Sequence, residues 1–384
     1  MTKYQYSLLG FSMLFRLIPG NRLAPAAISN TEFVQWEPVS GSQELIVFFG
    51  SRGATKFEFR NVFKGREHHK LHLRETGYRW FLDGVPGFAG SLSQLATVIG
   101  DLMKSIGAKR TTLVGSSMGA YAALYVGSAV RAQRVLAFSP QTVLHSGWEF
   151  TPEDVTLAQV VDLPAMIAKA KQTQFDVICS SEFLDVYHAA RLRGLGNVDI
   201  SIRKSGHNVL GNAHSYTGIV PFIESHIAGR GLPVKGLGLD KLDHEQGLRE
   251  FLNLFYERKF RDACAVAKRI MLCEQEWFDA KFMVGKCFYE LKDFSSAVPF
   301  LVAANRLDHM NTAVYVPLIA SYAGLGQTER AEGWLADFVL LLKATKQNVP
   351  TSLERVAAHV AGAGDKDLAA RIKSRANEYL EQAS

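Results

Sequence analysis

Residues 115–119 read Gly-Ser-Ser-Met-Gly and have the form G-x-S-x-G. A serine in this pattern can act as a nucleophile when a strand turns sharply into a helix around it, because the strained turn exposes its hydroxyl. Residues 111–114 predict the strand, and residues 120–125, rich in small side chains, predict the helix. Larger side chains at the two glycine positions would collide with these elements. The motif therefore predicts a nucleophile elbow at Ser117, beside a helix N-terminus that favours developing negative charge.

A serine nucleophile of this kind requires a histidine base and an orienting acid, which follow it in the order acid, then histidine. Two later strands are predicted over residues 175–179 and 198–202. Asp185 follows the first strand and His207 follows the second, near the strand ends at which ligands bind in open α/β sheets. We predict that Ser117, Asp185 and His207 form a catalytic triad.

Other acids and histidines compete for these roles. Glu182 is an alternative acid because it lies earlier in the same segment, whereas Asp176 opens its strand and is expected at the opposite end of the sheet. His188 lies one helical turn from Asp185, which makes it a candidate local capping partner. His207 alone follows a late strand with a glycine before it. The remaining histidines are scattered and most are expected on helices or the surface: His145, His214 and His226.

An oxyanion hole should use the backbone N–H after the nucleophile, which belongs to Met118, and a second N–H from the loop after an earlier strand. Residues 45–49 are continuously apolar, as expected for a strand buried on both faces. The glycine-bracketed loop that follows places Ser51 as the second donor, with the amide of Arg52 as the alternative. The Arg52 side chain is a candidate ligand for an anionic substrate, with a surface salt bridge as the other interpretation.

With these features, the chain from Thr31 to Ile227 resembles an α/β-hydrolase, which implies a mostly parallel sheet with flanking helices. The oxyanion loop reads Phe-Gly-Ser-Arg-Gly, whereas many esterases of the family carry a His-Gly start. This departure bears on the substrate class more than on the fold. Residues 78–84 and 136–141 are also similar to a bacterial subgroup that often occurs with repeat domains.

The organisation of the chain changes after this region. Residues 229–238 are rich in glycine and proline, and helical patterns replace strand patterns beyond them. We predict an α/β-hydrolase domain over residues 1–228, a linker over 229–242 and an all-α domain over 243–384. Each half is long enough for its own core, so a chain ending near Arg230 is expected to stay soluble and active.

The C-terminal half is self-similar. The sequence Phe-Tyr-Glu at residues 255–257 recurs at 288–290, and Ala297 recurs as Ala331 after 34 residues, which is the tetratricopeptide period. The tail thus resembles degenerate tetratricopeptide repeats, with a plain helical bundle as the alternative. Such repeats bind peptides or sister chains along a concave face, or here pack on the hydrolase. The small and aromatic repeat positions are Gly285, Phe288, Ala297 and Ala304.

Two segments carry open interpretations. Residues 141–173 form an insertion that is either a small lid over Ser117 or an ordinary crossover helix with a long lead-in. As a lid it is short, which favours modest acyl groups or an ester-bearing glycan over a long lipid. Residues 7–15 are apolar but interrupted by Arg16, so we expect an edge strand or helix there, and no membrane span.

Composition excludes several classes of protein. The 384 residues carry a formal net charge of +6, with 47% hydrophobic and 21% charged residues, as in a globular protein. The basic residues are dispersed, so nucleic-acid binding is not expected. The cysteines show no C-x-x-C spacing and no histidine cluster, which indicates reduced thiols and no metal site: Cys179, Cys264, Cys273 and Cys287.

Together these features predict a cytoplasmic serine hydrolase that cleaves an ester of a small molecule or glycan, without a cofactor. Ester cleavage is favoured over amide cleavage by analogy with the fold, and acyl transfer to an acceptor other than water stays open. The helical repeats are expected to bind a protein partner or position the substrate. The alternative is a catalytically degenerate hydrolase scaffold whose repeats mediate protein–protein interaction.

Overall fold

The computed structural model describes residues 28–145, 147–148, 151, 161–204, 206–210, 219–228 and 239–381. Three expectations fall on other residues. The N-terminal edge element, the glycine- and proline-rich part of the linker and most of the central part of the insertion lie outside the described residues.

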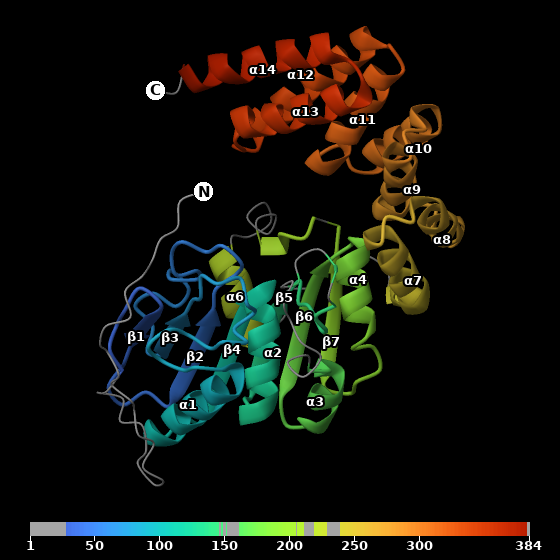
Figure 1. Ribbon diagram of the computed structural model, residues 1–384. Helices are drawn as coiled ribbons and strands as arrows, with labels where there is room; N and C mark the ends of the chain where they lie inside the picture. Colours follow the sequence, from blue (N-terminus) through green and yellow to red (C-terminus); the bar gives the residue numbers. More distant parts are fainter. Residues whose placement is uncertain are drawn as a thin grey trace.

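A seven-stranded sheet organises the first half of the chain (Figure 1). Its order is β1-β3-β2-β4-β5-β6-β7, and every neighbouring pair is parallel except β1 with β3. The strands are β1 (Val34–Glu37), β2 (Glu44–Phe49), β3 (His69–Leu73), β4 (Arg110–Ser116), β5 (Arg134–Phe138), β6 (Gln174–Ser180) and β7 (Val198–Arg203). Because the strands are parallel, β2, β4, β5, β6 and β7 all end at one edge of the sheet.

Alternate side chains of each central strand enter different cores, as the period of two in a strand requires. In β2, Val47 packs with α1 (Leu92–Ser105), α2 (Met118–Val130) and α3 (Leu163–Lys169). Its neighbour Phe48 packs on the other face, where α6 (Ile219–Ile227) lies. Burial on both faces explains why residues 45–49 are all apolar.

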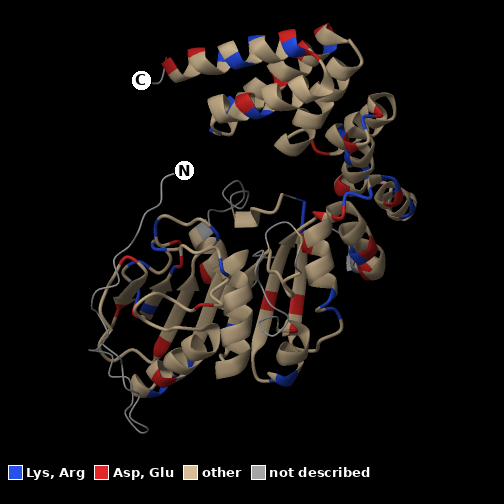
Figure 2. Cartoon of the chain, viewed as in Figure 1, with Lys and Arg blue, Asp and Glu red and all other residues tan. Residues whose placement is uncertain are grey.

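The second half of the chain is entirely helical where it is described. Two short 3-10 helices, η3 (Leu239–His244) and η4 (Thr312–Val314), accompany eight α-helices that curve away from the sheet and back above it (Figure 1). Positive and negative side chains are interspersed along these helices (Figure 2). The helices are α7 (Glu245–Tyr256), α8 (Phe260–Cys273), α9 (Phe278–Glu290), α10 (Phe294–Leu307), α11 (Tyr315–Gly324), α12 (Thr328–Ala344), α13 (Val349–Ala363) and α14 (Lys366–Glu381).

Close approach between α9 and α10 depends on a glycine. A Cβ placed on Gly285 would lie 2.8 Å from the Leu301 side chain and 3.1 Å from its backbone nitrogen. Ala297 and Ala304 are fully buried in the same core. The small residues therefore let the two helices pack closely, while the assignment of tetratricopeptide repeats stays a prediction.

The expected fold class is confirmed in its architecture: a mostly parallel α/β sheet with flanking helices is followed by an all-α region. The two regions share one hydrophobic cluster, in which Phe183 and Tyr187 of α4 (Phe183–Ala190) pack with Phe251 of α7 and Trp277 at the start of α9. Within the described residues, no helix has both the length and the apolar character that a membrane span requires.

Two local features refine the expectations. Asp185 lies in the first turn of α4, because the helix begins only three residues after β6 ends. In the insertion, α3 packs on the sheet as part of the crossover from β5 to β6. Residues 149–150 and 152–160, on which the lid interpretation depends, lie outside the described residues.

Candidate active site

Ser117 occupies a sharp turn between β4 and α2. Its φ is 51° and its ψ is −115°, a combination that L-residues rarely adopt. A Cβ on Gly115 would lie 2.2 Å from the carbonyl oxygen of Gly119, and one on Gly119 would lie 2.4 Å from that of Phe49. Both glycines of the motif are thus required by backbone packing on either side of the serine.

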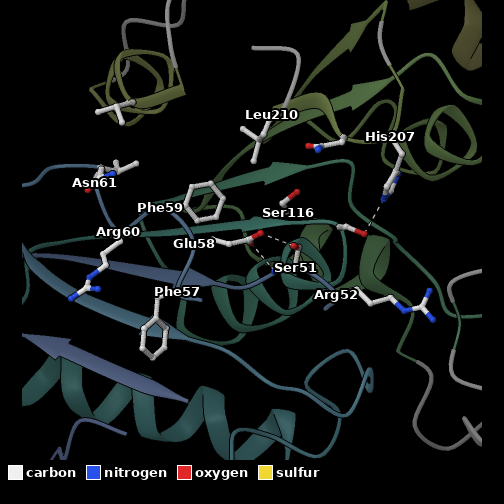
Figure 3. Close-up of a pocket in the computed structure, with 14 residues that line it drawn as sticks. Ser51, Arg52, Phe57, Glu58, Phe59, Arg60, Asn61, Ser116, His207 and Leu210 are labelled. Atoms are coloured by element: carbon white, nitrogen blue, oxygen red, sulfur yellow. Dashed lines mark hydrogen bonds between the residues drawn. The ribbon is translucent and has the colours of Figure 1, made fainter. Parts of the chain in front are cut away.

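The structure brings the three predicted triad side chains together. His207 Nε2 lies 2.9 Å from Ser117 Oγ, and His207 Nδ1 lies 2.8 Å from Asp185 Oδ1 (the first contact is dashed in Figure 3). A carboxylate only accepts hydrogen bonds, so Nδ1 carries the proton and Nε2 accepts from the serine hydroxyl. This is the geometry of a nucleophile, a base and a group that orients the base.

Asp185 is buried, with 1% of its surface exposed. Burial alone would raise its pKa, but the charge of His207 and the hydrogen bonds from His207 and Ser180 outweigh burial and hold the pKa below its ordinary value. Ser180 Oγ donates to Asp185 Oδ2 over 2.7 Å. The acid is therefore an ionised carboxylate at neutral pH, able to orient His207 and to stabilise its protonated form.

The backbone of His207 is held from two sides. Its N–H donates to Glu182 Oε1 over 3.0 Å, and its carbonyl oxygen accepts from Ser139 Oγ over 2.8 Å. Burial, followed by the charge of Asp185, raises the pKa of Glu182 to about 7. Glu182 thus contacts the histidine backbone, whereas Asp185 contacts the ring.

The other rival groups lie elsewhere. Asp176 pairs with Arg134 over 2.6 Å, at the sheet end away from Ser117, as its position at the start of β6 predicts. His188 Nδ1 accepts from the Thr142 backbone N–H over 3.1 Å, so this ring nitrogen has a partner outside α4. Burial lowers the pKa of His188 to about 3, so that it is neutral.

Two of the other rival histidines, His145 and His226, have partners outside the triad. The His145 ring packs against the Trp148 ring in a tilted arrangement, with centroids 4.2 Å apart. His226 Nδ1 contacts the Phe222 carbonyl oxygen over 2.9 Å within α6. His214 lies outside the described residues.

The two predicted oxyanion donors differ in their surroundings. Met118 is the first residue of α2 and directly follows Ser117, so its N–H has no acceptor within the helix. The Ser51 N–H donates instead to Glu58 Oε2 over 2.7 Å, and Ser51 Oγ donates to Glu58 Oε1 over 2.6 Å (Figure 3). In this structure the second predicted donor is therefore occupied by a carboxylate of the same loop.

A cavity of about 700 Å³ opens onto Ser117 (Figure 3). This size suits a small-molecule ligand. Its wall is mixed: aromatic and aliphatic side chains alternate with charged and amide groups. The lining residues are Ser51, Arg52, Phe57, Glu58, Phe59, Arg60, Asn61, Val62, Ser116, Ser117, His207, Asn208, Leu210 and Val220.

Arg52 lies at the cavity margin, with its guanidinium 5.2 Å from the centroid of the Tyr78 ring and 6.0 Å from that of Trp80. Cation–π contacts of this length favour the cation over the ring faces. The Arg52 side chain thus lies beside the cavity, and its predicted role in binding a substrate stays a prediction.

Sequence reasoning missed several residues that shape this site. Glu58 has no motif around it and reaches Ser51 only through the fold of its loop. Ser139 belongs to the segment 136–141, whose resemblance to a bacterial subgroup was a signal without an assigned role. Segment 136–141 contacts segment 78–84, which shares the same resemblance, since Trp80 Nε1 donates to Gln141 Oε1.

Among the residues that the structure describes, no three His, Cys, Asp or Glu side chains are grouped to hold a metal ion. The described cysteines are unpaired with one another, and Cys179, Cys264 and Cys287 are buried.

No family model matches the chain, and no curated protein sequence matches it. Several solved structures are distantly similar. A lipase-esterase related protein from Clostridium acetobutylicum is 15% identical, with 50% of this chain and 99% of that chain covered and a TM-score of 0.37. The capsule O-acetyltransferase of Neisseria meningitidis serogroup A is 14% identical, with 52% and 92% covered and a TM-score of 0.39. MenH from S. aureus is 13% identical, with 56% and 100% covered and a TM-score of 0.36.

Proposed function

We propose that this chain is a serine hydrolase that cleaves a carboxylic ester through an acyl-enzyme intermediate. The observation that carries the proposal is the unbroken chain of contacts from Ser117 Oγ through the His207 ring to the buried Asp185, at a cavity. An interaction scaffold has no need of these three side chains in this geometry, which argues against the alternative of a degenerate hydrolase.

The geometry suits a two-step acyl transfer. Ser117 Oγ attacks the acyl carbonyl carbon while its proton passes to His207 Nε2. The alcohol leaves with that proton, and an ester now links the acyl group to Ser117. Water then attacks the acyl carbon and gives a proton to His207. His207 passes this proton to Ser117 Oγ as the acyl–oxygen bond breaks, which releases the acid and restores the serine hydroxyl. Asp185 holds the ring and stabilises the imidazolium in both steps.

The oxyanion that forms in each step needs donors near the elbow. The N–H of Met118 is positioned by α2, and the N–H of Ser51 is the second donor in our proposal. Since Glu58 occupies the Ser51 N–H, its carboxylate must leave this amide before the oxyanion can use it. A negatively charged side chain in the hole would otherwise repel the developing negative charge.

The cavity suggests the class of substrate. Its volume suits a short acyl group or a small ester-bearing sugar, and Arg52 at its margin suits a substrate with an anionic group. The capsule O-acetyltransferase acts, by its name, in acyl transfer on a capsule. Hydrolysis of a glycan ester is our proposal for this chain, with the helical region positioning the substrate or binding a protein partner in the cytoplasm.

A fluorophosphonate probe and a short p-nitrophenyl ester test the proposal directly. The intact chain should be labelled at Ser117, as mapped by peptide mass spectrometry, and should hydrolyse the ester. Ser117→Ala should abolish both signals and leave the melting temperature nearly unchanged. Ser105→Ala, at the end of α1, is the matched control and should behave like the wild-type chain. Labelling and turnover that persist in Ser117→Ala would remove this serine from the mechanism.

A further inference from the structure

Two side chains at the start of α9 reach across to the segment that carries the predicted acid. Trp277 Nε1 donates to the Ser181 carbonyl oxygen over 2.6 Å. Asp279 Oδ2 accepts from the Phe183 backbone N–H over 2.5 Å. Trp277 is 1% exposed and Asp279 is 4% exposed, so both contacts are shielded from water.

The contact from Asp279 supplies a cap that α4 lacks within its own segment. The first N–H groups of a helix have no acceptor in the helix, and a side chain of the N-cap residue usually satisfies one of them. Glu182 is the N-cap of α4, but its side chain makes no capping hydrogen bond. Its carboxylate is directed to the His207 N–H instead. Asp279, from a helix 96 residues further along the chain, takes its place at Phe183.

The segment held in this way carries both groups that hold the histidine. Glu182 binds the His207 backbone, and Asp185 binds the His207 ring, from positions three residues apart at the start of α4. The ring of Phe183 between them packs on the Trp277 ring, with centroids 4.9 Å apart. A displacement of this short segment would therefore move both supports of His207 together.

We propose that Trp277 and Asp279 are positioning residues for the catalytic site, through which the helical region fixes the start of α4 and thereby the placement of Asp185 and His207 against Ser117. The inference rests on the proposed function, since it assigns α9 a part in that reaction. Neither residue touches the reacting atoms. Their effect passes through two backbone groups, the Ser181 carbonyl and the Phe183 N–H.

Charge is consistent with this arrangement. Burial, followed by the charge of the nearby Glu182, raises the pKa of Asp279 well above its ordinary value. Burying a carboxyl group costs free energy unless hydrogen bonds compensate for the lost contact with water. The Phe183 N–H is the hydrogen bond that the structure provides to Asp279 from α4. An apolar side chain in place of Asp279 would leave the Phe183 N–H, at the start of α4, without its acceptor.

The test uses the full-length chain and measures the maximal rate and the half-saturating concentration of fluorophosphonate labelling separately. Asp279→Ala and Trp277→Phe should lower the maximal rate roughly 10- to 100-fold, since a misplacement of about 1 Å costs about 10²-fold. The half-saturating concentration should stay within about twofold because the cavity is untouched. Asp279→Asn keeps a side-chain oxygen that accepts from Phe183 and should restore most of the rate.

Trp334→Phe is the control. Trp334 lies in the helical region, where its ring packs against Tyr315, and it belongs to the cluster of α9 to α14 and not to the cluster that contains α4. It should label at the wild-type rate. Wild-type rates in Asp279→Ala and Trp277→Phe would overturn the inference. So would a loss that Trp334→Phe shares or that Asp279→Asn fails to rescue, because either result indicates general destabilisation.

A second readout separates this inference from the proposed function. The His207 Nδ1 proton, held by Asp185, should give a strongly downfield NMR resonance in the wild-type chain and in Asp279→Asn. The resonance should be lost or broadened in Asp279→Ala. If wild-type Ser117 is not labelled but the resonance behaves in this way, the proposed function fails while the positioning role stands. A resonance that is unchanged in Asp279→Ala contradicts the positioning role, whatever the activity.

Discussion

At the scale of single residues, two carboxylates three positions apart have different partners around His207. Asp185 Oδ1 meets the ring nitrogen, and Glu182 Oε1 meets the backbone N–H. The first contact selects the tautomer that leaves Nε2 free for Ser117, and the second holds the loop in place. A carboxylate that binds the backbone has no influence on the tautomer, so the two acids should not be interchangeable.

We expect Asp185→Asn to lower kcat for a short ester by several orders of magnitude. The amide favours the wrong histidine tautomer, and the analogous change in the serine-protease case costs about 10⁴-fold. Glu182→Gln should cost far less, since its amide oxygen still accepts from the His207 N–H. Steady-state kinetics of the two variants, with folding checked by circular dichroism, measure the difference. The reverse order of effects would identify Glu182 as the orienting acid.

Glu182 should also make stability depend on pH. Burial and the Asp185 charge raise its pKa from 4.5 to about 7 in the folded chain. Between these two values the folded state keeps the proton that the unfolded chain has released, so the free energy of unfolding falls as pH rises through this window. The decrease ends once the pH exceeds the folded-state pKa, where both states have released the proton.

Glu182→Gln should remove this contribution, because the amide does not titrate. Urea unfolding of the wild-type chain and the variant at pH 5 and pH 7.5 measures it. The difference between the two proteins isolates Glu182 from other buried acids such as Asp176 and Asp279. Parallel pH profiles for the two proteins would show that Glu182 titrates in its ordinary range.

At the scale of elements, the elbow depends on contact between three backbone segments. The start of α2 lies against the end of β2, so that Gly119 meets the carbonyl oxygens of Phe49 and Gly50. The loop that carries Ser51 begins at this same point. The serine and its second predicted oxyanion donor are therefore linked by one close packing contact.

We expect Gly119→Ala to lower the free energy of unfolding by about 1–3 kcal/mol, because the methyl group would lie 2.4 Å from a backbone oxygen that cannot rotate away. Fluorophosphonate labelling should also slow, since the end of β2 must shift. The control is Gly333→Ala in α12, where the added methyl group meets nothing within 4 Å. That change should stabilise the helix by about 0.4–1 kcal/mol. Equal stabilities of the two variants would contradict the packing argument.

At the scale of the whole molecule, the hydrophobic cluster between α4 and the first helices of the C-terminal half joins the two regions. Val186, Tyr187 and Phe183 are buried there against α7 and α9. Composition predicts two separable units, but this packing predicts that the first half depends on the second. The sequence pattern changes near residue 230, but we propose that the regions before and after it fold as one cooperative unit.

We expect a chain ending at Arg230 to aggregate or to lose labelling at Ser117, because truncation exposes the apolar face of α4 and removes Trp277 and Asp279. A chain ending at Asp308, after α10, keeps both contacts and should label much more like the full-length protein. Size-exclusion chromatography and labelling rates of the three chains provide the comparison. A soluble, fully active chain ending at Arg230 would show that the first half is an independent domain.

The sequence alone determined the features that depend on neighbouring residues. The G-x-S-x-G spacing, the apolar runs of the strands and the change to helical periodicity each reflect local geometry, so they placed Ser117 at a turn and assigned the fold class. The order of Asp185 and His207 after two strands placed them near one edge of the sheet for the same reason, because parallel strands end at one edge.

The tertiary structure alone decided which groups meet across large separations in the chain. Only the first turn of α4 directs Asp185 to the ring and leaves Glu182 at the backbone of His207. Only the folded loop brings Glu58 onto Ser51, and only the packing of α9 brings Asp279 to Phe183. Hydrogen bonds of this kind depend on the relative placement of whole elements, and that placement is set by side-chain packing in the core, which no local pattern encodes.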